Sequence, residues 1–488
     1  MRERLLKQTP TLIAAYFLLG CLARLASSPT LEMDEAEQVL LSQLPMRWVY
    51  GSQPPLYTWL QKIVMAMFGQ SLFSLIVLKN ALLASTFLLT WATIKRLTQS
   101  HLYAAIGALM LMLVPQYIWE SQRDLTHSVL VTTCTAWTVY LVVRIYQTQS
   151  LSSYMMLGIA IAAGMLSKYN FVFPVVGLMV AALFFKNTRE CIFNYKAIST
   201  VGIAALVIGL QVYFILDART EVQTNISDFA ISGISVSSIS KGIYSFISDS
   251  FAFTILLFGV SLGVLYGTTE HEELDEDSFE IRRYFGMSLI VIVLLLVIAF
   301  AVTGGTDIKD RWLQPLYYLL PLYLCLRLAP YYDEHRQNVV LLIPTGIALI
   351  IFIVLPLQPL ISAATGKPSR RNAPYRELAE QLIRKGDNKP QILAADRKIG
   401  GNLKLIMPGA TVISADLPSL DMSINPSLPT LVIWEKKDTG MAPQRLFDLV
   451  SQGLQVTLPD VPLDAVMADQ YYTSKHQMTL NYDVIDPQ

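Results

Sequence analysis

The sequence predicts an α-helical polytopic membrane protein with a small α/β domain at its C-terminus. Of its 488 residues, 53% are hydrophobic and only 15% are charged, whereas about a quarter of the residues of a soluble domain carry a charge. Long apolar segments recur up to about residue 360, after which the composition becomes that of a soluble protein. We therefore predict two domains, a transmembrane module at residues 1–360 and a soluble α/β domain at residues 361–488.

The transmembrane module is predicted to contain about 11 spans, because a helix needs roughly 20 mostly apolar residues to cross a bilayer. The first span is not expected to be a cleaved signal peptide, since its apolar run is long and lacks a clean cleavage site. The predicted spans lie near residues 9–26, 72–94, 102–118, 126–143, 153–167, 170–185, 197–216, 251–267, 285–303, 315–329 and 339–358.

The distribution of Lys and Arg predicts a cytoplasmic N-terminus. With that orientation, the loops on the inner side hold more Lys and Arg than the outer loops, as the positive-inside rule requires. An odd number of spans then places the C-terminal domain outside the cytoplasm. We therefore expect a multi-pass membrane protein whose C-terminal domain is extracytoplasmic.

The C-terminal domain shows alternating helix and strand patterns. Apolar residues recur at helical spacing in residues 375–385, which end at Gly386, a typical helix stop. Residues 391–395 and 430–434 have the pattern of buried strands, and residues 444–451 that of another helix. No glycine-rich phosphate loop opens any of these helices, so we expect no nucleotide site.

The charge balance argues against nucleic-acid binding, and the cysteine pattern argues against a metal site or a disulfide framework. The 37 Lys and Arg residues equal the 37 Asp and Glu residues, so no basic excess is available to bind nucleic acid. The four cysteines lie in or beside apolar segments with no CxxC pair. They are predicted to be small packing residues and neither metal ligands nor disulfides.

The first outer loop contains an acidic segment that is costly beside a membrane unless it faces water or a polar substrate. Four carboxylates occur in the six residues from Glu32 to Glu37. Tyr50 and Gln53 follow, and Gln53 precedes a rigid Pro-Pro pair. Three other predicted outer segments add charges of both signs, as an active site above the bilayer requires. The first contains Arg123 and Asp124, the second Lys168, and the third Lys309 and Arg311.

Each of these groups also has a structural interpretation. Glu32, Glu35 and Glu37 are more typical of solvated loop residues than of catalytic groups, and Asp124 is equally suited to capping the next helix. Lys168 has the position of a lysine whose amine extends to the membrane surface. Lys309 and Arg311 are suited to binding anionic headgroups. Lys79, inside the second span, either extends to the surface or faces a polar cavity.

The ordered set of motifs resembles the GT-C membrane glycosyltransferases, specifically the bacterial branch similar to protein O-mannosyltransferases and lipid A aminoarabinose transferases. No single motif is specific, but their order is, over residues 1 to about 330. This chain has Gln53 where many relatives have His. The matching segments are Asp34-Glu35, Gln53-Pro54-Pro55-Leu56, Arg123-Asp124, Gly164–Tyr169, Lys309–Pro315 and Leu319-Leu320-Pro321.

The resemblance implies inverting transfer of a sugar from a polyprenyl-phosphate donor to a hydroxyl of a membrane lipid or glycolipid, such as lipid A or lipopolysaccharide core, or of a protein. The general base is expected to be Asp34, with Glu35 and Asp124 as further catalytic candidates. The resemblance assigns the donor phosphate to Lys168, Arg311, Lys309 and Arg123, and the sugar to Tyr50 and Gln53.

We expect no cofactor and no metal ligands; Mg²⁺ or Mn²⁺ bound by the acidic loops is an alternative that we do not favour. The protein is expected to act as a monomer. Two other functions remain open. A transporter or lipid flippase would concentrate charges near the middle of the bilayer and show two related halves, and a non-catalytic scaffold would use only the C-terminal domain.

Overall fold

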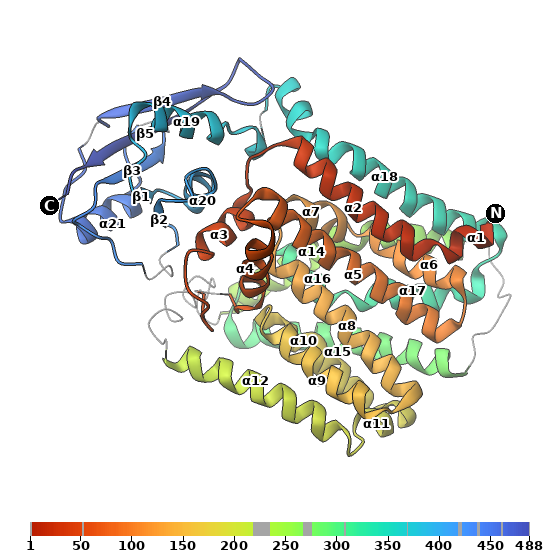
Figure 1. Cartoon of the computed structure of the whole chain (residues 1–488). Helices are drawn as coiled ribbons and strands as arrows, with labels where there is room; N and C mark the ends of the chain where they lie inside the picture. Colours follow the sequence, from red (N-terminus) through yellow and green to blue (C-terminus); the bar gives the residue numbers. More distant parts are fainter. Residues whose placement is uncertain are drawn as a thin grey trace. The chain divides into compact units, whose positions relative to one another are not determined.

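The computed structural model describes residues 2–50, 53–217, 235–266, 276–306, 309–367, 369–417, 422–436, 440–459 and 462–487. These residues form two compact units (Figure 1). The first, called the helical unit, contains residues 1–19, 52–57 and 79–352. The second, called the α/β unit, contains residues 20–51, 58–78 and 353–488. Most of the first outer loop, including Asp34 and Tyr50, therefore belongs to the same compact unit as the C-terminal residues, whereas Gln53 belongs to the helical unit.

The helical unit is built from long apolar helices and shorter ones between them. Within the described residues of the chain, seven helices are long and apolar enough to cross a membrane, or up to eight if one bent pair counts as a span. The seven are α2 (Thr9–Ser27), α5 (Leu72–Thr98), α8 (His127–Thr148), α12 (Ala197–Asp217), α14 (Val236–Leu265), α15 (Glu276–Thr303) and α18 (Glu334–Ala364).

The other four predicted spans correspond to shorter or broken helices. The bent pair joins α6 (His101–Met110) and the turn η1 (Leu111–Leu113) to η2 (Gln116–Glu120) and α7 (Ser121–Arg123), with a bend of 80°. Three apolar segments are only 10–17 residues long: α9 (Leu151–Met165), η3 (Tyr169–Phe171) with α10 (Val172–Ala182), and α17 (Leu319–Leu328) with η5 (Ala329–Tyr331). The multi-helix architecture is as predicted, while the count of 11 spans stays a prediction.

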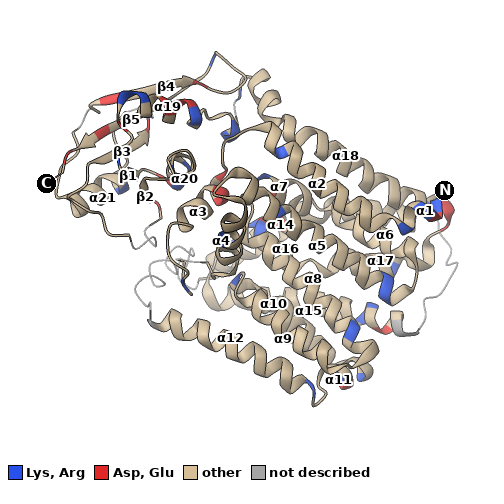
Figure 2. Ribbon diagram, viewed as in Figure 1, with Lys and Arg blue, Asp and Glu red and all other residues tan. Residues whose placement is uncertain are grey.

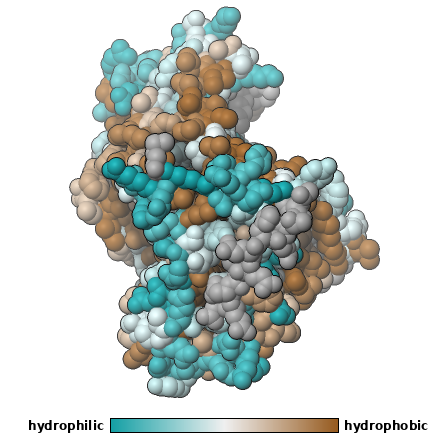
Figure 3. Space-filling model, turned by 90° about the vertical axis from the view of Figure 1, so that its right-hand side faces the viewer, coloured by the Kyte–Doolittle hydropathy of each residue, from teal (hydrophilic) through white to brown (hydrophobic). Residues whose placement is uncertain are grey.

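The remaining short elements of the helical unit are α1 (Arg2–Lys7), α11 (Lys186–Ile192), η4 (Asp310–Trp312) and α16 (Leu313–Leu316). Charges are sparse along the long helices, and blue residues mark α1, which carries Arg2, Arg4 and Lys7 (Figure 2). On the face shown in Figure 3, hydrophilic residues form a band with hydrophobic residues beside it. Exposed apolar side chains on helices such as α12 and α18 are expected where lipid is the solvent.

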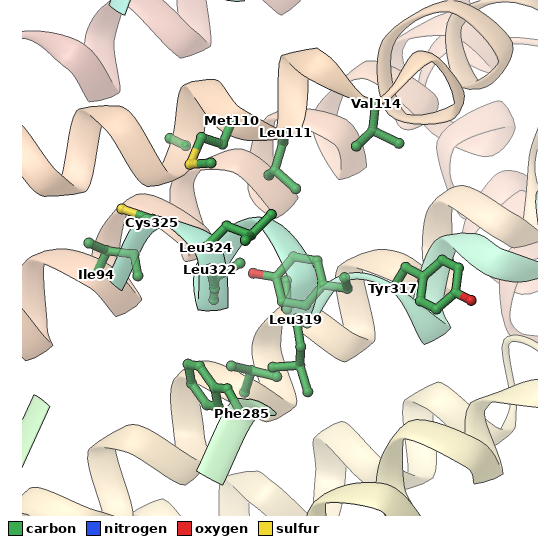
Figure 4. Packing of buried hydrophobic residues seen from close by; sticks show 14 of the residues in the cluster. Ile94, Met110, Leu111, Val114, Phe285, Tyr317, Leu319, Leu322, Leu324 and Cys325 are labelled. Carbon is green, nitrogen blue, oxygen red and sulfur yellow. The ribbon is translucent and has the colours of Figure 1, made fainter. Parts of the chain in front are cut away.

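One continuous apolar core holds the helical unit together. Ile94 of α5, Met110 of α6 and Phe285 of α15 pack around α17, which contributes Leu322 and the thiol of Cys325 (Figure 4). These side chains are at most 1% exposed. All four cysteines are buried and free, as the sequence predicted for apolar packing residues.

The α/β unit contains a five-stranded sheet in the order β2-β1-β3-β5-β4. β1 pairs in parallel with β2 and β3, and β5 pairs antiparallel with β3 and β4. The strands are β1 (Gln391–Ala394), β2 (Thr411–Ser414), β3 (Thr430–Glu435), β4 (Asp464–Asp469) and β5 (Gln477–Ile485), and the helices in this part are α19 (Tyr375–Lys385), α20 (Arg397–Ile406) and α21 (Gln444–Leu454).

Alternation along the strands separates the two faces of the sheet. Ile392 and Ile433 pack against α19 and α20 on one face, whereas Leu393 and Val432 pack against α21 on the other. The helix predicted at residues 375–385 is confirmed as α19, and Gly386 ends it with φ 80°, a conformation that suits glycine. Both predicted strands and the helix that begins at Gln444 are also confirmed.

Two helices from the N-terminal part complete the α/β unit. α3 (Met33–Leu41) contains the acidic segment of the first loop, and most of α4 (Leu56–Phe68) belongs to the same unit. Leu40 and Leu41 of α3 are buried in the same core as α19, α20 and the sheet. The short turn η6 (Arg370–Asn372) precedes α19, and its Arg371 side chain is 1% exposed.

Candidate active site

Helix α3 carries Asp34 in its first turn, where an acidic group is favoured by the helix dipole. Its N-terminus is closed by a capping box in which the Glu32 amide donates to the Glu35 carboxylate at 3.1 Å. Asp34 itself is half-buried. The structure therefore holds Asp34 on an ordered helix and not in an irregular loop.

The three glutamates around Asp34 each lie beside an arginine. Glu35 is 1% exposed and accepts from Arg24 at 3.1 Å. Glu32 lies 3.5 Å from the guanidinium of Arg371, and Glu37 pairs with Arg397. The interpretation of these glutamates as solvated loop residues is therefore wrong for Glu32 and Glu35, both of which are buried.

Glu37 and Asp34 influence each other electrostatically. Burial raises the pKa of the Glu37 carboxyl, the Arg397 guanidinium lowers it in part, and the charge of Asp34 raises it again. Residues three apart on a helix face the same side, so these two carboxylates share a face of α3. Asp34 thus lies in a cluster of charges that sequence reasoning did not resolve.

Tyr50 is buried, and its hydroxyl is used within its own loop. The hydroxyl donates to the Pro45 carbonyl at 2.9 Å and accepts from the Arg47 amide at 3.0 Å. Trp59 of α4 donates to the Arg47 carbonyl at 2.8 Å, which closes the same loop from the other side. These bonds give Tyr50 the task of shaping the 45–50 turn.

In the helical unit, the segment from Asp124 to Ser128 is contacted by two buried lysines. Lys79 is 2% exposed and donates to the Asp124 backbone carbonyl at 3.3 Å. Lys168 is 9% exposed and donates to the Ser128 hydroxyl at 2.7 Å. Neither amine extends to the surface of the unit. The structure therefore does not support the interpretation that these two lysines extend their amines to the membrane surface.

Further polar contacts fix the same region. Gln122 donates to Asn80 at 2.8 Å, and His127 Nδ1 lies 3.3 Å from the Ser167 carbonyl oxygen. The Leu56 amide, three residues after Gln53, donates to the Leu166 carbonyl at 2.9 Å. The helical unit therefore brings together residues 53–57, 79–80, 122–128 and 166–168.

The turn after Lys168 also contacts the segment that contains Arg311. Asn170 donates to the Trp312 carbonyl at 3.0 Å. Arg311 is half-buried, whereas Lys309 is exposed. Arg123 forms an ion pair of 3.0 Å with Glu120 in the same short helical stretch. Lys168 and Arg311 thus stand on neighbouring turns, while Arg123 has a local carboxylate partner.

A π-helix at Gln116–Glu120 precedes Arg123 and Asp124; such π-bulges are frequent at functional sites. Gln314 donates to the Gln116 carbonyl at 2.8 Å and to the Ser121 hydroxyl at 3.2 Å. Tyr117 in turn donates to the Gln314 carbonyl at 2.7 Å. The sequence analysis did not predict this role of Gln314, although Gln314 lies in the motif Lys309–Pro315.

Among the described residues, no group of three or more His, Cys, Asp or Glu side chains is arranged to hold a metal ion. The buried groups near Asp124 are instead lysines, amides and hydroxyls, which donate hydrogen bonds to anions. Donors of this kind near Asp124 and Lys168 are chemically suited to an anionic group.

Comparisons with known proteins agree with this architecture. Residues 52–214 match the family described as dolichyl-phosphate-mannose-protein mannosyltransferase. The chain is 34% identical over 439 residues to the lipopolysaccharide core galacturonosyltransferase RgtB of Rhizobium johnstonii, covering 87% of this chain and 86% of that protein. It is 28% identical over 457 residues to RgtA of the same organism, another lipopolysaccharide core galacturonosyltransferase, covering 90% and 89%.

Among solved structures, ArnT from Cupriavidus metallidurans bound to undecaprenyl phosphate has the same fold. The TM-score is 0.62 and the match covers 97% of each chain, at 11% sequence identity. The similarity to the galacturonosyltransferases extends over nearly the whole length of both chains and is not limited to one domain. The chain therefore belongs to the GT-C membrane glycosyltransferases, in the bacterial branch similar to protein O-mannosyltransferases and lipid A aminoarabinose transferases.

Proposed function

We propose that this glycosyltransferase moves a galacturonosyl residue from a polyprenyl-phosphate carrier to a sugar hydroxyl of the lipopolysaccharide core, with inversion at the anomeric carbon. The reaction would take place at the periplasmic side of the inner membrane, where the carrier lipid can present its sugar. The sugar and the acceptor are taken from the names of the two Rhizobium relatives. The carrier is suggested by the undecaprenyl phosphate bound to ArnT.

The observation that carries the proposal is the buried ammonium group of Lys168 beside Ser128. A cation in a low-dielectric interior interacts more strongly with an incoming anion than a solvated cation does. As the bond from the sugar to the phosphate breaks, the phosphodiester becomes a phosphomonoester and gains negative charge. Lys168, with Arg311 on the neighbouring turn, would stabilise that charge as it develops.

The bond changes follow from the reaction class. The acceptor oxygen forms a bond to the anomeric carbon while the bond from that carbon to the phosphate oxygen breaks, and the bonding electrons leave with the phosphate. The proton of the acceptor hydroxyl passes to a general base. We propose Asp34 as that base, since it is a half-buried carboxylate on an ordered helix, and a base of this kind contributes about 10²–10⁴-fold.

The other candidates receive narrower roles in this proposal. We assign Asp124 to holding the acceptor or the sugar, and Gln53 to hydrogen bonding to the sugar. Glu35, buried against Arg24, and Tyr50, bonded within its own turn, are assigned structural roles. Lys309 and Arg123 are kept as outer, more exposed cations that attract the donor.

Mass spectrometry of lipopolysaccharide from a deletion strain and a complemented strain tests the function. The expected result is loss of a hexuronic acid from the core oligosaccharide in the deletion strain and its return on complementation. An unchanged core together with a missing sugar on another envelope lipid or on a protein would overturn the acceptor. Transfer by the purified enzyme from a polyprenyl-phosphate hexose, with no transfer from the galacturonosyl donor, would overturn the sugar.

A further inference from the structure

The region after the transmembrane helices is connected to α3 by several independent contacts. The closest approach is between Gly401 of α20 and Ala36 of α3. A Cβ atom at Gly401 would lie 2.4 Å from the Ala36 carbonyl oxygen and 2.6 Å from its Cα atom. Only glycine fits at such a distance from a neighbouring backbone, so α20 and α3 are in direct backbone contact two residues after Asp34.

Polar contacts fix both ends of α3 to the same region. At the N-terminal end, the Leu31 amide donates to the Asn402 side chain at 2.9 Å, and Thr30 donates to the Ala373 carbonyl at 2.7 Å. Beyond the C-terminal end, the Gln43 amide group pairs with the backbone of Val412 in the edge strand β2. One bond is 3.0 Å and the other 2.9 Å, which is the pattern of one added ladder pair.

Charged contacts are made by the residues that flank Asp34, Glu32 and Glu37. Arg397 binds Glu37, one turn after Asp34, and also binds Asp416 at 3.0 Å through its Nε atom. Arg371 lies beside Glu32, two residues before Asp34. Both arginines come from the C-terminal region. Removing either guanidinium leaves a partly or fully buried carboxylate without its cation, which is costly.

We propose that residues 369–417 set the position of Asp34, with Arg397, Gly401 and Asn402 as positioning residues that act through α3. This inference rests on the proposed function, in which Asp34 is the general base. Proton abstraction demands a base within hydrogen-bonding reach of the acceptor hydroxyl. A displacement of about 1 Å can lower the rate about 100-fold. The C-terminal α/β elements are then a part of the catalytic apparatus and not a separate accessory module.

The test compares Gly401→Ala with Gly409→Ala in the full-length enzyme. Gly401→Ala forces α3 away, whereas a Cβ at Gly409 meets nothing within 4 Å. Transfer is measured in nanodiscs with a polyprenyl-phosphate galacturonosyl donor. The amount of donor bound per protein molecule measures the fraction of each variant that is folded. We expect kcat per bound donor to fall at least about ten-fold for Gly401→Ala, with the donor KM unchanged, and wild-type values for Gly409→Ala.

If Gly401→Ala does not fold, Arg397→Met and Arg397→Lys test the same positioning role. The methionine variant is expected to lose kcat while retaining donor KM, and lysine is expected to restore part of it, because it returns the charge without the planar two-sided contact. Wild-type kcat in Arg397→Met, or a kcat loss fully explained by fewer donor-binding molecules, would overturn the inference. Full activity of Asp34→Asn would instead overturn the proposed base, so the two failures are distinguishable.

Discussion

Glu35 and Arg24 form a buried ion pair, with Arg24 Nη2 3.1 Å from the Glu35 carboxylate and side chains 5% and 1% exposed. Arg24 also donates to the Ser28 carbonyl at 2.6 Å and to the Thr30 carbonyl at 2.8 Å. One guanidinium therefore joins the end of α2 to the turn that leads into α3. Glu35 is adjacent to Asp34 in sequence, yet its environment gives it a structural task.

Breaking this pair is expected to destabilise the protein. Glu35→Gln leaves the buried Arg24 without its counter-charge, and loss of one partner of a buried pair costs about 3–5 kcal/mol. The measurement is the thermal unfolding temperature in detergent, with Glu3→Gln as the control, because Glu3 and Lys7 form an exposed pair. Normal stability with complete loss of transfer would instead indicate that Glu35 takes part in the chemistry.

Asp34→Asn is expected to abolish transfer while expression and donor binding remain. The amide has the size of the carboxylate but cannot accept the proton, so the loss is expected to be about 10²–10⁴-fold. Turnover is measured with purified enzyme and donor, with Asp469→Asn, at an exposed position of β4, as the matched control. More than about a tenth of wild-type turnover would identify another base, with Asp124 next in line.

Lys168→Ala and Arg311→Lys test the phosphate interaction. Each is expected to weaken donor binding and slow turnover, since a hydrogen bond to a charged group contributes about 1.5–3 kcal/mol and lysine cannot reproduce the planar guanidinium. If both cations act on one phosphate, the double variant shows non-additive effects. Arg327→Lys, which changes an exposed arginine in the last turn of α17, is the control. Near-normal activity of both single variants would reject the phosphate role.

Lys79→Ala tests whether the buried lysine holds the Asp124 segment in place. We expect turnover to fall about ten-fold or more, because the variant removes a charged hydrogen bond to the Asp124 carbonyl inside a buried region. Lys241→Ala, which changes an exposed lysine of α14, is expected to have no effect. Wild-type kinetics of Lys79→Ala would mean that the segment keeps its position without the lysine.

The topology prediction concerns the C-terminal domain. The Lys and Arg distribution and the odd number of predicted spans predict that residues after 365 lie outside the cytoplasm. Alkaline phosphatase is active only outside the cytoplasm, so a fusion of this enzyme after residue 365 is expected to be active. Green fluorescent protein fused at the same site and exported through the Sec route is expected not to fluoresce. A fluorescent fusion would reverse the orientation.

The sequence by itself determined the membrane class, the long apolar helices and the alternation of helix and strand near the C-terminus. These features depend on composition and on local periodicity, which a sequence displays directly. It also supplied the ordered motifs that led to the family. Composition and periodicity do not decide whether the three short apolar helices cross the membrane, because a helix of 10–17 residues has no length signal that separates a span from a buried helix.

Only the tertiary structure decided which charged residues are structural. Four carboxylates in six residues look alike in the sequence, but the fold buries Glu35 against Arg24 and Glu32 against Arg371, while Asp34 stays half-buried. Arg371 and Arg397 lie more than 300 residues from their partners. The cost of burying a charge is set by what lies beside it in space, and no local pattern reports a neighbour so distant in the chain.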